Sequence, residues 1–308
     1  MNESQPRICV LMAVFNGVRW VPEQLDTILS QVGVYVSVMV SVDPSVDGSE
    51  SLIGMIAGSD CRVCLLQMSK RFGGAGRNFY RLLRDVDMSG FDYVCYADQD
   101  DIWHSEKLWR AHCLMTEKAA HGYSSNVMAF WPDGKTRLVD KAQPQRQWDF
   151  SFEAAGPGCT YVMRQDLALA IQDLIRSRWD AVQAVALHDW LSYAFARANG
   201  FKWVIDPRVG MQYRQHSANQ VGVNAGWRAF KYRVGKVLGG WGTAQAATIA
   251  SLVGLDNAAF VRRWKSGGRL GMLWLALNAN QCRRRKRDRV LFALSCVTLA
   301  VLGRTHKL

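Results

Sequence analysis

Three carboxylates at the end of a short apolar run are the side chains best suited to chemistry in this sequence. Asp98, Asp100 and Asp101 follow residues 93–97, where a buried strand is expected to emerge into solvent. Carboxylate oxygens suit Mg²⁺ or Mn²⁺, and Mg²⁺ shares the phosphate oxygens of its substrate. The cluster therefore predicts a metal that holds a diphosphate. The alternative is an acidic turn before the helix expected over residues 106–119.

Two further aspartates, Asp43 and Asp47, follow another expected strand. In the first half of the chain, apolar runs of strand length alternate with stretches of helical spacing, which is typical of a parallel sheet flanked by helices. The strands are expected at residues 8–14, 34–42, 63–67 and 93–97, and the helices at 21–29, up to 57, and up to 86. Because carboxyl ends of parallel strands share one edge, Asp43, Asp47 and the acidic cluster should face the same crevice.

A glycine-rich stretch, residues 73–76, opens the third of these helices. It is not the dinucleotide-binding fingerprint, because it follows the third strand and lacks the G-x-G-x-x-G spacing. Two interpretations stay open. The stretch is either a flexible loop near a phosphate or a turn that needs positive φ.

Asp189 is the candidate for acid–base chemistry in the second half. It stands where a helix ending at residue 198 is expected to begin. The positive end of a helix favours the ionised carboxylate that a general base needs, and His188 could orient it. The alternative is an aspartate that only caps the helix.

For several other polar and aromatic side chains, the sequence is compatible with either a functional or a structural role. His216, after the strand-like residues 201–205, is either a ligand or a structural residue. Arg214 either contacts a phosphate or forms a surface salt bridge. The aromatic side chains of residues 148–152 alternate as in a strand, and they either stack on a sugar or pack in the core.

The charge of the chain is concentrated at one end. The formal net charge of the 308 residues is +12. Residues 225–308 contain 16 Lys and Arg against Asp256 and Asp288, whereas residues 1–224 contain 22 basic and 24 acidic side chains. The sequence therefore predicts a near-neutral domain over 1–224 and a basic helical segment over 225–308.

The basic segment combines its cations with apolar stretches. Residues 225–238 mix aromatic with basic side chains, and the apolar residues 271–277 precede five consecutive cations at 283–287. The apolar residues 290–302 would form a helix of only about 20 Å, short of the roughly 30 Å hydrocarbon core. We expect this segment to lie on an anionic membrane surface. The alternative is a helical appendage that packs on the body or on a second subunit, and no nucleic-acid partner is expected.

The cysteines and the N-terminus indicate a cytoplasmic location. The eight cysteines have no regular spacing, and the pair Cys61 and Cys64 has no partners for a zinc site, so all are interpreted as reduced thiols. Residues 1–6 are polar and are followed directly by a strand, so no signal peptide is expected.

Several motifs follow one another along the chain in a fixed order: Val14-Phe-Asn-Gly17, Asp43 to Ser49, Gly74 to Phe79, Asp98-Gln-Asp-Asp-Ile-Trp103, Gly156-Pro-Gly-Cys-Thr160, His188-Asp-Trp190 and Tyr213 to Asn219. This order resembles that of family 2 glycosyltransferases with the GT-A fold, and in particular the subgroup that includes many bacterial rhamnosyltransferases of surface-polysaccharide assembly. The resemblance covers roughly residues 7–222. One departure is Pro44, where the family commonly has a second aspartate, and this puts the hydrogen bonding of that loop in doubt.

The resemblance implies a role for each candidate residue. It implies an inverting, metal-dependent transfer of a sugar, with Asp189 as the general base. It implies Mn²⁺ or Mg²⁺ held by Asp98, Asp100, Asp101 and His216, with Asp100 the favoured direct ligand. The donor would be a dTDP- or UDP-sugar, and its binding is assigned to Asp43, Asp47, Asn78, Asp98 and Arg214.

The acceptor implied by the resemblance is a glycan or a lipid-linked sugar at the inner face of the membrane. Two alternatives remain at this stage: a nucleotidyltransferase on a similar sheet, and a non-catalytic membrane-surface partner that retains the fold. The sugar, the acceptor and the oligomeric state stay open.

Overall fold

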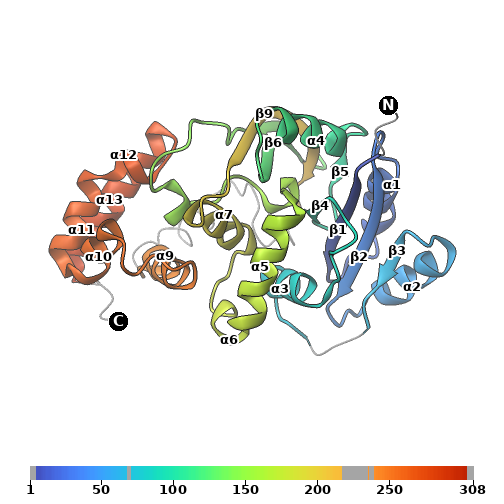
Figure 1. Cartoon of the computed structure of the whole chain (residues 1–308), viewed down its shortest axis with the longest axis horizontal. Helices are drawn as coiled ribbons and strands as arrows, with labels where there is room; N and C mark the ends of the chain where they lie inside the picture. Colours follow the sequence, from blue (N-terminus) through green and yellow to red (C-terminus); the bar gives the residue numbers. More distant parts are fainter. Residues whose placement is uncertain (1–4, 68–70, 217–234, 236–238, 304–308) are drawn as a thin grey trace.

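The structure is a computed structural model that describes residues 5–67, 71–216, 235 and 239–303, and these residues are built around a nine-stranded sheet (Figure 1). The strands are β1 (Arg7–Val14), β2 (Tyr35–Val42), β3 (Val63–Leu65), β4 (Tyr93–Ala97), β5 (Ile102–Trp103), β6 (Gly122–Phe130), β7 (Thr136–Val139), β8 (Val162–Arg164) and β9 (Trp203–Arg214). Their order is β3-β2-β1-β4-β8-β6-β9-β5, and β7 pairs with β6.

The strands of the first half are parallel, as the sequence predicts. β1 pairs in parallel with both β2 and β4, and β2 pairs in parallel with β3. Beyond β4 both directions occur, because β8 is antiparallel to β4 and β6 while β9 is parallel to β6. The carboxyl ends of β1, β2 and β4 therefore lie at one edge, where the predicted acidic residues follow them.

Helices of the first two thirds of the chain cover both faces of the sheet, and further helices follow towards the C-terminus. They are α1 (Val21–Leu29), α2 (Ser49–Ser59), α3 (Ala75–Asp85), α4 (Lys107–Glu117), α5 (Gln165–Ser177), α6 (Trp179–Val182), α7 (His188–Ala198), α9 (Trp241–Leu252), α10 (Ala259–Ser266), α11 (Gly268–Leu277), α12 (Ala279–Cys282) and α13 (Lys286–Leu302). Two short 3₁₀ turns are η1 (Asp149–Ser151) and η2 (Gly158–Thr160).

The alternation of side chains along β1 explains its continuous apolar run. Cys9 and Leu11 join a core cluster with α3, α5 and α7, whereas Val10 and Met12 join a second cluster with α1 and α4. Both faces of the strand are buried, so polar residues have no place on either face. The predicted strands and helices of the first half are confirmed to within a few residues.

The C-terminal helices form a separate layer at one end of the molecule, opposite α2 (Figure 1). α11 packs along α13, and the first cluster continues into this layer through residues such as Trp264, Leu275 and Leu299. None of the helices among the described residues is both long and apolar enough to cross a bilayer.

The structure differs from two predictions about local structure. The aromatic residues 148–152 do not form a strand, because they fold into the 3₁₀ turn η1 and pack on the C-terminal helices; Trp148, for example, stacks on Phe260 at 4.5 Å. The strand expected at 201–205 is longer, since β9 continues to Arg214. Residues 217–219 of the last motif and nearly all of residues 225–238 lie outside the described residues.

Candidate active site

A pocket of about 640 Å³ lies where β1, β2 and β4 end. It is lined by residues from both halves of the chain. The lining includes Asp43, Arg71, Gly73, Asn78, Asp98, Gln99, Asp100, Lys141, Ala154, Gly156, Gly158, His188, Asp189 and His216. The structure thus brings together most of the site residues that the sequence predicts.

Asp100 and His216 meet at this pocket although 116 positions separate them. His216 Nε2 lies 2.7 Å from Asp100 Oδ2, and the His216 ring stacks on Trp20 at 5.5 Å. Because β9 runs beside β5, the end of β9 delivers His216 to the loop that follows β4. An imidazole nitrogen and a carboxylate oxygen at this spacing form a pair that can hold a divalent ion.

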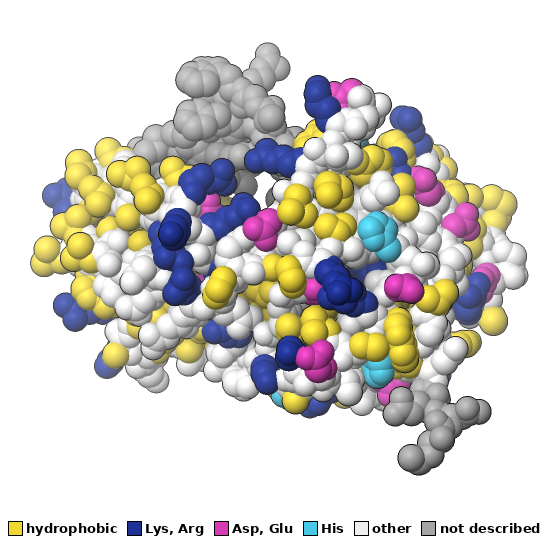
Figure 2. Space-filling model, turned by 90° about the horizontal axis from the view of Figure 1, so that it is seen from above, with side chains coloured by type: hydrophobic (Ala, Val, Ile, Leu, Met, Phe, Trp, Pro, Cys, Tyr) yellow, Lys and Arg dark blue, Asp and Glu magenta, His cyan; other side chains and the backbone are white. Residues whose placement is uncertain are grey.

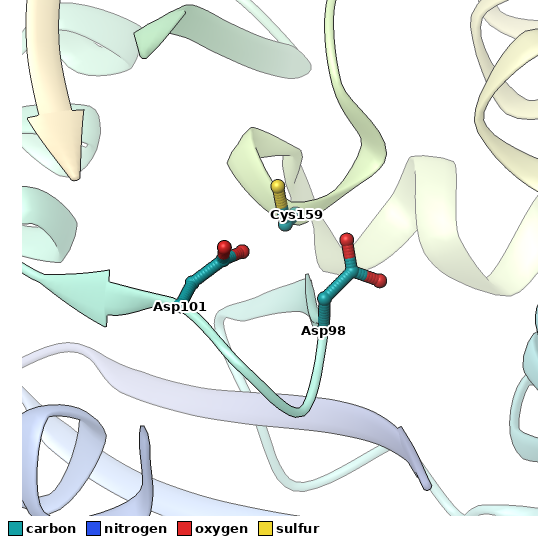
Figure 3. A group of neighbouring side chains, drawn as sticks. All are labelled: Asp98, Asp101 and Cys159. Atoms are coloured by element: carbon teal, nitrogen blue, oxygen red, sulfur yellow. The ribbon is translucent and has the colours of Figure 1, made fainter. Parts of the chain in front are cut away.

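Asp98 and Asp101 face each other across the thiol of Cys159 (Figure 3). One ligand atom from each of the three residues lies within 4.8 Å of the others. Burial raises the pKa of Asp98, and the neighbouring carboxylates of Asp100 and Asp189 raise it further. Burial also raises the pKa of Asp101, followed by repulsion from Asp98 and Asp100. Without a cation, these carboxylates resist ionisation.

Lys107 lies behind this cluster and is almost completely buried. Its ammonium lies 3.2 Å from the centre of the Trp103 ring and has no hydrogen-bond acceptor within the described ranges. Burial lowers the pKa of Lys107 to about 8. A lysine whose charged form is disfavoured offsets the acidic cluster only in part.

The cluster fits a hard divalent cation on its pocket side. Asp98, Asp100 and His216 line the pocket, whereas Asp101 is 1% exposed and its Oδ2 atom has no hydrogen-bond partner in the described part of the chain. The oxygen and imidazole atoms suit Mn²⁺ or Mg²⁺, whereas the thiol of Cys159 does not. Burial keeps that thiol protonated by raising its pKa. Asp101 and Cys159 therefore support the cluster from behind.

At the β2 side of the pocket, Asp43 holds the glycine-rich loop. Its carboxylate oxygens accept hydrogen bonds from the backbone nitrogens of Phe72 and Gly73, each at 3.1 Å. Gly73 has a φ of +78°, so the turn interpretation of this stretch is confirmed, while the stretch also lines the pocket. Asn78 is buried below and donates to Ser41 O at 3.0 Å.

Asp47 does not line the pocket. Its carboxylate accepts hydrogen bonds from Val18 N and from Ser49 N, both at 3.0 Å, and so ties two loops together. Ser45 next to Pro44 adds a second tie, since its hydroxyl accepts from Asn16 N at 3.0 Å. The loop that departs from the family pattern is therefore well hydrogen-bonded.

Arg214 also stands outside the pocket lining. Its Nε donates to the carbonyl of Asp100 at 2.8 Å, and its guanidinium pairs with Glu23 at 2.5 Å. Its backbone nitrogen donates to Asp101 Oδ1 at 3.1 Å. These contacts fix the backbone of the acidic loop, and a contact with phosphate stays a prediction.

Asp189 lies in the first turn of α7 and opens into the pocket. Burial raises its pKa to about 6, against the lowering effect of the hydrogen bond from Trp190 N at 2.7 Å. Gly158 allows this close packing, because a Cβ there would lie 3.1 Å from Asp189 Cβ and 2.9 Å from His188 Nε2. A carboxylate with this pKa is mostly ionised at neutral pH and can accept a proton.

His188 does not orient Asp189 by a hydrogen bond. Its ring stacks on Phe79 at 3.9 Å, burial lowers its pKa to about 3, and its Nε2 has no hydrogen-bond partner among the described residues. It is a neutral packing residue beside Asp189.

Three residues that line the pocket are not predicted as site residues from the sequence. Gln99 pairs with the backbone of Phe15 through both its amide atoms, at 2.8 and 3.1 Å, and so fastens the acidic loop to β1. Arg71 and Lys141 bring cations to the pocket. Gln99 stands inside the motif from Asp98 to Trp103 but has no role assigned from the sequence. No local pattern marks Arg71 or Lys141, although Arg71 directly precedes the glycine-rich stretch.

The comparisons with known proteins agree with this geometry. Residues 9–155 match the family described as Glycosyl transferase family 2. The chain is 40% identical over 287 residues, 93% of its length and 99% of the relative's, to a dTDP-rhamnosyl transferase, RfbG, of Shigella flexneri.

Solved structures share the fold at low sequence identity. S. aureus TarS 1-349 in complex with UDP-GlcNAc is 12% identical, with a TM-score of 0.54 and coverage of 96% of this chain and 89% of that one. The mannosyltransferase PcManGT from Pyrobaculum calidifontis, in complex with GDP-Man and Mn²⁺, is 16% identical, with a TM-score of 0.53; the match covers 99% of this chain and 89% of that one.

Proposed function

Because the chain belongs to glycosyl transferase family 2 and is a glycosyltransferase with the GT-A fold, we propose that it transfers rhamnose from dTDP-rhamnose with inversion of configuration. The acceptor is a hydroxyl of a glycan or lipid-linked sugar in polysaccharide assembly. The observation that carries the proposal is the 40% identity to a dTDP-rhamnosyl transferase over nearly the whole of both chains. The pocket supports it by joining the acidic cluster to Asp189.

Asp189 is the general base of the proposed reaction. As the acceptor oxygen attacks the anomeric carbon, Asp189 takes its proton, and the bond to the diphosphate breaks on the opposite face of the sugar. This single displacement inverts the anomeric centre. Burial and the hydrogen bond from Trp190 N hold the carboxylate in one orientation.

The donor nucleotide lies against the β2 side of the pocket in this proposal. Asp43 and Asn78 are fixed there by hydrogen bonds, and Arg71 adds a positive charge at the same wall. Asp98, Asp100 and His216 would hold Mn²⁺ or Mg²⁺, with Asp101 supporting them. Such an ion would supply Lewis-acid stabilisation of the charge that develops on the leaving diphosphate.

We place the enzyme at the inner surface of a membrane, in the cytoplasm. The support is the exposed apolar face of α11 and α13 together with the cations of the basic segment. A lipid-linked acceptor would be presented at such a surface.

The first test is nucleotide-dependent stabilisation of the full chain. With Mn²⁺ present, dTDP should raise the melting temperature by several degrees and by more than UDP, GDP or CMP, because a ligand that binds only the folded state stabilises it. Asp100→Ala should lose this shift, whereas Asp133→Ala, on an exposed loop, should keep it.

The second test is turnover of dTDP-rhamnose. The proposal predicts that Mn²⁺-dependent dTDP release needs an acceptor and falls about 10²- to 10⁴-fold in Asp189→Asn, while dTDP binding is retained. Stabilisation by UDP or GDP in place of dTDP would overturn the donor assignment. Full activity of Asp189→Asn would overturn the assignment of the base.

A further inference from the structure

Lys141 stands on the wall of the pocket that is opposite the donor side. It follows β7, which pairs with β6, and the sheet order separates β6 from β2 by β8, β4 and β1. Its Cβ would lie 3.8 Å from a Cβ added at Gly156. Its charge is also close enough to Asp189 to favour the ionised form of that carboxylate. Lys141 thus belongs to the side of the pocket where the acceptor meets the base.

Within the described part of the chain, the ammonium of Lys141 has no anionic partner of its own. Its backbone nitrogen donates to Asn126 Oδ1 at 2.6 Å, but the side chain has no hydrogen bond or ion pair among the described residues. The nearby carboxylate of Glu153 is already engaged, because it accepts from Arg284 N at 2.7 Å. Burial lowers the pKa of Lys141, and Arg284 and Arg283 add to this against the attraction of Glu153.

More cations lie around the same wall. Arg283 donates to Phe152 O at 2.7 Å, and Arg285 reaches Asp140 Oδ2 at 3.5 Å, so both flank the loops that carry Lys141 and Gly156. In Figure 2, Lys and Arg side chains gather where the C-terminal helices, on the left, meet the rest of the molecule. Such a concentration of positive charge attracts anions to the rim of a pocket.

We propose that Lys141 binds an anionic group of the acceptor, a phosphate or a carboxylate, beside the hydroxyl that Asp189 deprotonates. This inference rests on the proposed function and specifies its acceptor class. A partly buried ammonium that lines a pocket is stabilised when an anion binds beside it, and an anionic acceptor supplies one. The phosphate of a lipid-linked sugar and the carboxylate of an acidic sugar share this chemistry.

The test measures binding, so that it needs neither turnover nor the natural acceptor. The full chain is saturated with Mg²⁺ and dTDP, which fills the donor side, and is titrated calorimetrically with geranyl diphosphate and with methyl glucuronide. Geraniol is the uncharged control for geranyl diphosphate, and methyl glucoside is the uncharged control for methyl glucuronide. The variants are Lys141→Met and Lys141→Arg, and Lys202→Met on an exposed loop is the matched control.

We expect one anionic probe to bind wild-type protein at least about tenfold more tightly than Lys141→Met, since a charge-assisted hydrogen bond is lost. Lys141→Arg should stay within about threefold of wild type, because it keeps the cation, and Lys202→Met should match wild type. The neutral probes should not distinguish wild type from Lys141→Met. The anionic probe that binds identifies the source of the charge.

Several results would overturn the inference. One is equal binding of both anionic probes to wild type and Lys141→Met, and another is no binding of either to wild type. Weaker dTDP binding in Lys141→Met would assign the lysine to the donor diphosphate instead. If dTDP itself does not bind the wild-type protein, the assignment of dTDP as the donor nucleotide is wrong. The titration is then repeated with the nucleoside diphosphate that stabilises the protein. A wrong donor nucleotide is thereby distinguished from a wrong role for Lys141.

Discussion

At the scale of single residues, the acidic groups of the pocket are adapted to function at a cost in stability. Asp189 is partly buried beside the acidic cluster, and this burial raises its pKa to about 6 from the usual value near 4. Ionising it in the folded protein therefore costs on the order of 2–3 kcal/mol relative to the unfolded chain. The start of α7 and Lys141 reduce this cost without removing it.

The sign of this effect gives a prediction for stability. Because the folded-state pKa is raised, the penalty is absent below about pH 4, grows between pH 4 and 6, and is complete above pH 6. Asp189→Asn removes the charge, so its melting temperature should exceed that of wild type by several degrees at pH 7.5 and by less at pH 4.5. Asp180→Asn, an exposed control, should show no such difference.

The same pKa predicts the acid limb of activity. The rate of sugar transfer at saturating substrates should fall as the pH drops below about 6, because the protonated carboxyl of Asp189 accepts no proton. An unchanged rate down to pH 4.5, with the protein still folded, would argue against Asp189 as the base.

At the scale of elements, the C-terminal helices brace one wall of the pocket. Arg284, in the link between α12 and α13, is buried and donates to Asp149 Oδ2 at 2.9 Å and to Ala154 O at 2.6 Å. Tyr193 of α7 donates to the same Asp149 oxygen at 3.0 Å. The loop that leads to Gly156 is thus tied both to α7, which carries Asp189, and to the C-terminal layer.

Removing Arg284 should therefore destabilise the fold as well as the pocket. Arg284→Met leaves two buried carboxylates without their main partner, and we expect the free energy of unfolding to fall by about 3–5 kcal/mol in urea denaturation. Arg287→Met is the control, because Arg287 is 71% exposed and its pair with Asp288 contributes little. A loss below about 1 kcal/mol in Arg284→Met would mean that the C-terminal layer does not brace the pocket.

At the scale of the whole molecule, apolar side chains gather on one surface of the C-terminal layer. They come from α11 and α13, which pack side by side, and hydrophobic side chains also mark this end of the molecule in Figure 2. The exposed members are Leu270, Leu273, Leu277, Val290, Leu291, Leu294, Val297, Val301 and Leu302. Exposed cations adjoin them at Arg263, Arg269 and Lys286. An apolar face bordered by cations is complementary to an anionic bilayer.

Vesicle binding checks this surface. The full chain should co-sediment with vesicles that contain phosphatidylglycerol and much less with phosphatidylcholine alone, and added salt should weaken the binding. The double variant Leu277→Glu with Leu294→Glu should reduce the partition coefficient at least about tenfold, because two apolar contacts are lost.

A matched control uses apolar residues that are exposed elsewhere. Val32→Glu with Met55→Glu alters two such side chains of the N-terminal half and should bind vesicles as wild type does. If the double variant at α11 and α13 instead dissociates a dimer and leaves vesicle binding intact, the surface is a contact between two copies of the chain.

Sequence patterns alone predict the alternation of strands and helices and the edge of the sheet at which the aspartates gather. These features depend on local patterns: β1 is apolar because both its faces are buried, and Asp98 follows β4 because the chain turns where that strand ends. Ordered motifs likewise indicated the family, which the relatives confirm.

Which distant residues meet, in contrast, depends on the tertiary fold. His216 reaches Asp100 because β9 lies beside β5, and Lys141 enters the pocket because β7 is attached to β6. Residues 148–152 turn into η1 because the C-terminal helices pack on their aromatic rings, which outweighs their strand-like alternation. Contacts of this kind depend on how elements far apart in sequence pack together, and local side-chain periodicity contains no record of that packing.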